Sequence, residues 1–336
     1  RLRQVKESLD ATRPEKTRGV DLRGWEWFHL FHETRSEQVG YGGHSGRVSA
    51  AVFSPDGQRA ASAGDDGTVH LWEASTGIRR RSWKLSAADP LTLAFSPDGS
   101  HLAAGSGNST LYILDVTANE PRHTLHGHLL AINAVAYSAN GRLLATAGAD
   151  NTIKLWNADT GREQATLVGH TDEVRRLWFH HEKQRLASLG NDRTLRFWDL
   201  ETGQEEHQAV KKSIPSICAL SPDLNRLAIW REREAKMVVL EVSKDEPLAE
   251  IPGYVSRVLD LNFSDDGMLL VFADADGDAT VLDWARPRLL AHYRGSPTSV
   301  AFSAGGDRII ARCGDDRVRI WPARSPQPDA VVGHES

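Results

Sequence analysis

Short runs in which apolar and polar residues alternate follow one another along most of this chain. Residues 48–53 and 59–63 form one such pair of runs, separated by Ser54-Pro55-Asp56-Gly57. A period of two places alternate side chains on opposite faces of a β-strand. Pro and Asp-Gly favour the tight reversal between antiparallel strands. The pattern therefore predicts hairpins of short strands.

The same turn recurs in phase along the chain, at residues 53–57, 95–99, 137–141, 221–223, 263–267 and 302–306. A second marker, an apolar run that ends in Trp, follows it at Trp72, Trp156, Trp198 and Trp321, with degenerate copies at 111–114, 238–240 and 280–282. Gly-His pairs at 43–44, 127–128, 169–170 and 333–334 complete the unit. The period is about 41–42 residues, which is typical of a propeller blade of four strands.

These units resemble WD repeats, in which Gly-His, Phe-Ser-Pro-Asp-Gly, an Asp-containing turn and Trp-Asp follow one another. The resemblance covers roughly residues 37–334, although only Trp198-Asp199 is a literal Trp-Asp pair. It implies an all-β fold, a seven-bladed β-propeller of four-stranded antiparallel blades. Two segments compete to close the ring, residues 37–41 and residues 329–332. We expect the N-terminal segment to supply the outer strand of the seventh blade. Whether an eighth unit exists stays open.

Residues 1–36 depart from the repeat and form a separate region ahead of the propeller at 37–334. Leu2, Val5 and Leu9 fit one face of a helix, and residues 21–31 are expected to form a short aromatic helix. This region resembles the stretch that precedes the WD repeats in large bacterial serine/threonine protein kinases, through Arg13-Pro14 and Leu22-Arg23-Gly24-Trp25-Glu26-Trp27. Because the sequence begins at Arg1, we expect a piece of a longer protein, with an upstream kinase as the implied context.

Three units carry a His, a hydroxyl residue, an Asp and a Trp at one spacing: His44, Ser62, Asp66, Trp72; His128, Thr146, Asp150, Trp156; and His170, Ser188, Asp192, Trp198. Ser, His and Asp together suggest a hydrolase. A catalytic triad occurs once, however, whereas this set repeats once per blade. The resemblance to WD repeats implies a buried hydrogen-bonded tetrad instead. We therefore predict no catalytic residue in this chain.

Composition narrows the remaining chemistry. The chain has 40 Lys and Arg against 45 Asp and Glu, a net charge of −5, which is unlike the basic surface that nucleic acid requires. No apolar run reaches the length of a membrane span, and no signal peptide is visible. Asp274 begins a calcium-like run, but the expected Glu is replaced by Ala285, so a turn is favoured. We predict no metal and no cofactor. A cytoplasmic location is favoured, and an extracytoplasmic one stays open if a membrane span lies upstream.

The loops that enter each blade and the turns between second and third strands share one face of a propeller. Blade five carries a charged turn beside Trp230, and Trp and Arg are frequent in binding hot spots. The candidates for partner contact on this face are Arg47, Asp65, Asp89, Asn133, Glu173, Arg175, Asn191, Trp230, Arg231, Arg233 and Arg257.

The sequence thus predicts a monomeric, non-catalytic scaffold or sensor module that binds a protein or a peptide. One alternative is a ligand-binding or enzymatic propeller that uses its central channel. The other is a passive spacer within a larger chain. An unpaired cluster of carboxylates or histidines in the channel would favour the first, and a bland face would favour the second.

Overall fold

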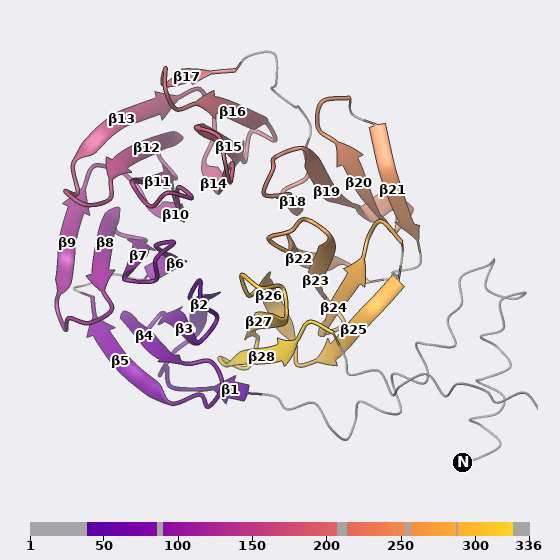
Figure 1. Cartoon of the computed structure of the whole chain (residues 1–336), viewed down its shortest axis with the longest axis horizontal. Helices are drawn as coiled ribbons and strands as arrows, with labels where there is room; N and C mark the ends of the chain where they lie inside the picture. The colour runs from indigo at the N-terminus through magenta and orange to yellow at the C-terminus, as the bar shows by residue number, and fades with distance from the viewer. Residues whose placement is uncertain are drawn as a thin grey trace, which may run out of the picture. The chain divides into compact units, whose positions relative to one another are not determined.

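The computed structural model describes residues 39–85, 90–206, 214–244, 246–252, 256–286 and 288–324. Their strands form seven antiparallel sheets of four strands each, arranged as blades around a ring (Figure 1). This confirms the predicted seven-bladed β-propeller. The helical segment expected at residues 1–36 lies outside the described residues.

In blades 1 to 6 the strands run outward from the ring centre in chain order, and in blade 7 the outermost strand is β1. Blade 1 holds β2 (Val48–Phe53), β3 (Arg59–Gly64), β4 (Thr68–Glu73) and β5 (Arg79–Lys84); blade 2 holds β6 (Pro90–Phe95), β7 (His101–Ser106), β8 (Thr110–Asp115) and β9 (Pro121–His126). Blade 3 holds β10 (Ile132–Tyr137), β11 (Leu143–Gly148), β12 (Thr152–Asn157) and β13 (Glu163–Val168); blade 4 holds β14 (Val174–Phe179), β15 (Arg185–Gly190), β16 (Leu195–Asp199) and β17 (Gln204–Glu205). Blade 5 holds β18 (Cys218–Leu220), β19 (Arg226–Arg231), the 3-10 turn η2 (Glu232–Glu234), β20 (Lys236–Glu241) and β21 (Glu246–Pro252). Blade 6 holds β22 (Val258–Phe263), β23 (Leu269–Asp274), β24 (Asp278–Asp283) and β25 (Arg288–Arg294); blade 7 holds β26 (Pro297–Phe302), β27 (Arg308–Cys313), β28 (Val318–Pro322) and β1 (Val39–Tyr41).

The N-terminal strand closes the ring. Strand β1 pairs antiparallel with β28, so that Val39 lies opposite Ile320 and Tyr41 opposite Val318. This confirms that the N-terminal segment supplies the outer strand of blade 7, and the competing segment at 329–332 lies outside the described residues. Closure in this way pairs the exposed edge that the last blade would otherwise present.

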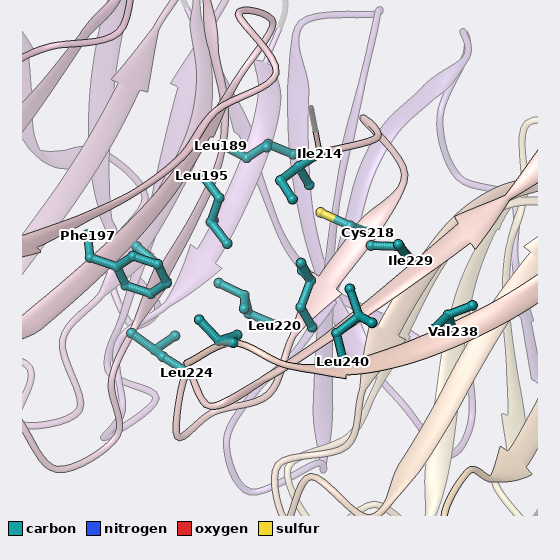
Figure 2. Close-up of a cluster of buried hydrophobic side chains, with 13 residues drawn as sticks. Leu189, Leu195, Phe197, Ile214, Cys218, Leu220, Leu224, Ile229, Val238 and Leu240 are labelled. Atoms are coloured by element: carbon teal, nitrogen blue, oxygen red, sulfur yellow. The ribbon is translucent and has the colours of Figure 1, made fainter. Parts of the chain in front are cut away.

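The core lies between neighbouring blades, because each sheet is covered on both faces. Figure 2 shows the layer between blades 4 and 5, where Leu195 and Phe197 face Leu220 and Leu240. Cys218 lies in this layer as a buried free thiol, and Cys313 is buried in the layer between blades 6 and 7. Both cysteines therefore pack as small apolar residues.

Two faces of the ring are distinguished by their loops. The tetrad face carries the loops that enter each innermost strand and the turns between second and third strands. The hairpin face carries the turns between first and second strands and between third and fourth strands. Six of the described innermost strands shift register by one residue near the tetrad face, as between Val174 and Arg176. Such an extra residue re-aims the side chains that follow it.

Candidate interaction face

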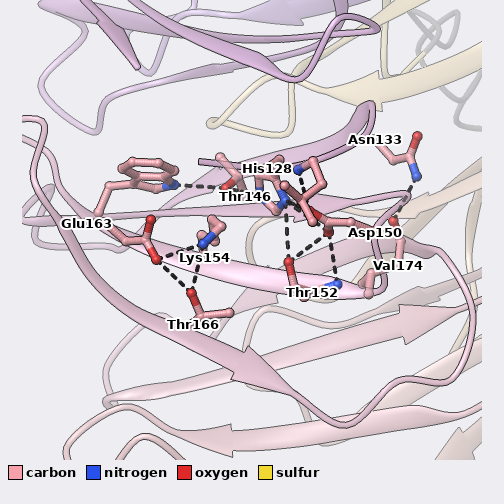
Figure 3. Close-up of polar contacts among 11 residues, drawn as sticks. His128, Asn133, Thr146, Asp150, Thr152, Lys154, Glu163, Thr166 and Val174 are labelled. Atoms are coloured by element: carbon pink, nitrogen blue, oxygen red, sulfur yellow. Dashed lines mark hydrogen bonds and ion pairs between the residues drawn. The ribbon is translucent and has the colours of Figure 1, made fainter. Parts of the chain in front are cut away.

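The predicted tetrad of blade 3 is fully formed (Figure 3). Trp156 Nε1 donates to Thr146 Oγ1 at 2.9 Å, and Thr146 Oγ1 lies 2.7 Å from His128 Nε2. His128 Nδ1 lies 3.0 Å from Asp150 Oδ2. The carboxylate accepts from Nδ1–H, so Nε2 accepts the hydroxyl proton and the imidazole is neutral. Burial lowers the pKa of His128, and the opposing attraction of Asp150 does not overcome it.

Blade 4 repeats this geometry. Trp198 Nε1 donates to Ser188 Oγ at 2.8 Å, and Ser188 Oγ lies 2.8 Å from His170 Nε2. His170 Nδ1 lies 2.9 Å from Asp192 Oδ2. Burial alone would raise the pKa of Asp192, but hydrogen bonds from Thr171, Thr194 and His170 lower it to about 2. Ser188 is fully buried, so this Ser-His-Asp set is closed to a substrate.

The tetrad carboxylates hold the loops of the tetrad face. Asp150 accepts the backbone N–H of Leu129 at 2.9 Å and that of Thr152 at 3.1 Å. Asp192 accepts the N–H of Thr171 in the same way at 3.0 Å. Each tetrad therefore fixes one entry loop and one turn together, and side chains on these loops are presented from a rigid base.

Blade 1 departs from the expected tetrad. His44 Nε2 lies 2.8 Å from Ser62 Oγ, but the indole N–H of Trp72 is buried without a partner among the described residues. Tyr41, which comes from blade 7, stacks on Trp72 with ring centroids 5.0 Å apart. Its hydroxyl lies 2.8 Å from Nδ1 of His70. The prediction for Trp72 is wrong in this respect, because ring closure replaces a hydrogen bond of the tetrad with aromatic stacking.

The two tryptophans allow a direct measurement of the tetrad bond. Both changes remove the same ring atoms, but Trp198→Phe also removes the donor to Ser188, whereas the N–H lost in Trp72→Phe has no partner among the described residues. Both side chains are buried, so the loss of packing is similar. We expect Trp198→Phe to cost about 1–2 kcal/mol more than Trp72→Phe in the free energy of unfolding, measured in urea. Equal costs in both variants would contradict a stabilising role for the indole bond.

His70 gives blade 1 a dependence on pH. The side chain is buried and its ring stacks on His44 with centroids 4.1 Å apart. Burial, with repulsion from His44 and Arg79, lowers the pKa of His70 to about 4. The unfolded state binds more protons between pH 6.5 and 4, so stability is present at neutral pH and is lost as pH falls through this window. By pH 5 the loss from His70 amounts to about 2 kcal/mol.

Urea unfolding at pH 7 and pH 5 measures this loss. The variant His70→Gln keeps a polar group near Tyr41 and removes the titrating one. We expect its stability to fall less between the two pH values than that of the unaltered protein. An identical fall in both proteins would show that His70 does not carry the effect.

Most of the sequence-predicted contact residues lie on the tetrad face, where they pair with one another. Arg47 Nε lies 3.5 Å from Asp65 Oδ2, and Arg175 lies 2.6 Å from Glu173. Arg175 Nε also donates to Asn191 at 3.3 Å. These charges, with the exposed Arg257, form a polar rim that is open to solvent. Asp89 lies outside the described residues.

Asn133 and Trp230 make contacts between neighbouring blades. Asn133 Nδ2 donates to the carbonyl of Val174 at 3.2 Å and so joins blade 3 to blade 4. Trp230 is only 6% exposed and packs with Met237 and Phe272 between blades 5 and 6. The expectation that Trp230 faces a partner is therefore wrong, because β19 extends through this position and is covered on both sides.

The charged turn that follows Trp230 is open to solvent. The strand ends at Arg231, which lies 3.5 Å from Glu234 across η2. Arg233 is exposed on the same turn. Of the residues predicted for blade 5, the two arginines thus remain accessible.

Sequence reasoning missed an apolar pair on the tetrad face. Leu129 is 84% exposed and Leu130 is 55% exposed. Both follow the Gly-His of blade 3, where blades 1 and 4 have Ser45-Gly46 and Thr171-Asp172. A comparison of the three entry loops shows the difference, since only blade 3 places two large apolar residues there.

Paired charges cross the central channel. Arg176 of β14 lies 2.6 Å from Asp260 of β22, although blade 5 separates their blades. Asp260 also accepts Ser299 Oγ at 2.7 Å and the N–H of Val300 at 3.1 Å. Burial alone would lower the pKa of Arg176, but the Asp260 carboxylate raises it. The channel charges thus join blades 4, 6 and 7.

Two further features are absent from the described part of the chain. No group of three or more His, Cys, Asp or Glu side chains is placed to hold a metal ion there. None of its helices has both the length and the apolar character needed to cross a bilayer.

Comparison with known proteins finds short curated matches and extensive structural ones. The chain is 49% identical over 51 residues to the ribosome biogenesis protein erb1 of Aspergillus clavatus, which is 15% of this chain and 6% of that protein. It is 38% identical over 66 residues to the serine-threonine kinase receptor-associated protein of Gallus gallus, covering 19% of each. The matches thus span a small part of these relatives.

The solved structure of U3-55K matches with a TM-score of 0.71 at 20% identity, covering 85% of this chain and 98% of that one. The RRP9 WD40 repeats match with a TM-score of 0.70, also at 20% identity, covering 85% and 97%. At such identity the likeness shows the fold alone. A family model described as WD domain, G-beta repeat, matches residues 35–73, and one described as IFT122 first beta-propeller matches residues 90–336. The chain belongs to the WD-repeat β-propeller family, in the group described as the IFT122 first β-propeller.

Proposed function

We propose that this propeller is a non-catalytic scaffold that binds a protein or peptide segment on its tetrad face, around Leu129 and Leu130. The exposure of these two side chains is the observation that carries the proposal. Apolar residues that a fold does not bury, on a face that also carries exposed charged residues, are typical of interaction sites.

The loop that carries the leucines is held in place independently of them. Its anchor is the backbone N–H of residue 129, which donates to Asp150. The equivalent N–H groups of Ser45 and Thr171 bond to Asp66 and Asp192 with polar side chains in place. Blade architecture thus does not require leucine, and a rigid apolar pair limits the entropy lost when a partner binds.

Transferring the loop sequence of blade 4 into blade 3 tests this. The double variant Leu129→Thr, Leu130→Asp keeps the hydrogen bond from the backbone to Asp150, so we expect its melting temperature to stay unchanged. Affinity capture from a lysate should lose the partner that the unaltered protein retains. The matched control is Met268→Asp, which removes a half-exposed apolar side chain from the hairpin face and should keep the partner.

Two outcomes would count against the proposal. Equal capture by the protein and the double variant would move the binding site away from the leucines. Capture of no partner by any of these proteins would favour the passive spacer.

Several features support a protein partner within a larger assembly. The net charge of −5 favours protein over nucleic acid as the ligand. The relatives with short matches are named as a ribosome biogenesis protein and a serine-threonine kinase receptor-associated protein. Through Leu22-Arg23-Gly24-Trp25-Glu26-Trp27, residues 1–36 support a bacterial kinase context, in which the propeller is a monomeric module.

A further inference from the structure

A cavity of about 500 Å³ lies on the hairpin face between blades 2 and 3. The turn from β6 to β7 forms one wall with Pro97 and Asp98. The turn from β10 to β11 forms the other with Asn140 and Gly141, and Tyr137 lies at its base. This cavity is separate from the tetrad face.

The first residue of the second strand is arginine in blades 1, 4, 5 and 7, and leucine in blades 3 and 6. Arg308 of blade 7 donates to the carbonyl of Gly57 in blade 1, and its guanidinium lies 5.3 Å from the centre of the Phe53 ring. Arg59 of blade 1 donates to the carbonyl of Gly99 in blade 2 at 3.2 Å. In both places the first residue of a second strand reaches the glycine of the next turn. At these two junctions the position holds a guanidinium that bonds to the neighbouring turn.

Blade 2 has His101 at this strand position, and the side chain does not reach blade 3. Its Nε2 lies 2.6 Å from Arg122 Nη1, and its Nδ1 lies 2.7 Å from Ser100. A Cβ atom placed on Gly141 would meet only Pro97, at 3.5 Å, where Gly57 and Gly99 meet a guanidinium. The junction between blades 2 and 3 thus has no guanidinium at the glycine of its turn.

Tyr137 ends the first strand of blade 3, the position that Phe53 holds in blade 1. Its hydroxyl is shielded from solvent and has no hydrogen-bond partner among the described residues. Because the hydroxyl oxygen has almost no accessible surface, a ligand in the cavity contacts Tyr137 through its ring.

The charges around the cavity are of both signs. Asp98 stays ionised, because hydrogen bonds from Ser96 and Ser100 lower its pKa to about 2. Arg142 is exposed at the rim, and Arg122 is bound to His101 and to the carbonyl of Asp159 at 3.3 Å. The Asp98 carboxylate would repel a bound anion. A bound cation would instead contact this carboxylate, a backbone carbonyl and an aromatic ring.

We propose that this cavity binds an arginine side chain of a partner peptide, which takes the position that Arg59 and Arg308 occupy at their own junctions. The guanidinium donates to the carbonyl of Gly141 and lies over the ring of Tyr137. The site is independent of the function proposed for the tetrad face.

Titration with short peptides tests the proposal. The probe is acetyl-Gly-Arg-Gly-amide, and its controls carry citrulline or lysine in place of arginine, with binding followed by NMR shifts of the propeller. We expect the arginine peptide to bind at least tenfold more tightly than the citrulline peptide. Equal binding of both, or shifts away from blades 2 and 3, would overturn the proposal.

A variant that fills the cavity with one of the protein's own side chains provides a matched comparison. His101→Arg restores the intramolecular guanidinium, so it should raise the melting temperature and weaken peptide binding at least tenfold. Tyr137→Leu removes the aromatic ring over which the guanidinium lies and should weaken binding several-fold, which keeps the test valid if His101→Arg folds poorly. Arg59→His should open a second site between blades 1 and 2. Undiminished binding by both His101→Arg and Tyr137→Leu would overturn the proposal.

Discussion

Replacement of Asp260 by alanine is expected to lower the free energy of unfolding by about 3 kcal/mol, near the lower end of the cost of breaking a buried ion pair. The substitution leaves Arg176 in the channel without its carboxylate, and Ser299 and the N–H of Val300 lose their acceptor. The cost stays near the lower end because Arg176 is in part exposed to the channel. Urea unfolding followed by tryptophan fluorescence measures it.

The control is Asp65→Ala on the tetrad face. Asp65 lies 3.5 Å from Arg47, and both side chains are open to solvent, so its removal should change stability by less than about 0.5 kcal/mol. The double variant Arg176→Met, Asp260→Leu should recover most of the loss, because no charge then remains unpaired. Equal losses in the two aspartate variants would mean that channel water screens the pair as bulk solvent does.

Replacement of His170 by alanine is expected to cost about 2–4 kcal/mol, because the change strands two buried groups at once. Ser188 loses the acceptor of its proton, and Asp192 loses the Nδ1–H donor. The void left by the ring adds to this cost. Asp192 keeps the N–H of Thr171 and of Thr194, so the entry loop should remain attached and the fold should persist.

Blade 5 supplies the comparison, since it lacks the tetrad. Asn225→Ala removes an exposed amide from the turn before β19, and we expect a change of less than about 0.5 kcal/mol. The melting temperature of each variant, taken in one buffer, measures the difference. Similar shifts in both would refute the stabilising role of the tetrad and leave apolar packing as the dominant force in every blade.

The repeat made much of this fold predictable. Alternation and turn residues are local signals, and seven copies in phase reinforce one another, so blade number and tetrad positions follow from the sequence. The N-terminal strand was also correctly chosen for closure. The bond missing at Trp72 was not predictable in the same way, because it depends on Tyr41, which reaches blade 1 only through ring closure.

The remaining differences also arise where distant residues meet. Trp230 precedes a charged run that suggested exposure, but its strand continues to Arg231 and buries the indole. Arg176 and Asp260 lie on different blades, and register shifts in their strands help to aim them at one another. The cavity between blades 2 and 3 lies where His101 does not extend to the next turn. This can be recognised only by comparing His101 with Arg59 and Arg308, which do extend to it.

Closure by β1 also determines when the propeller can be completed. Residue 39 pairs with residue 320, so this contact forms only after the last blade has left the ribosome. Until then the growing chain carries an unpaired N-terminal strand and an open sheet edge, and contacts so distant in sequence form slowly. Synthesis therefore leaves the outer edge of blade 7 unpaired until β28 has emerged and β1 can pair with it.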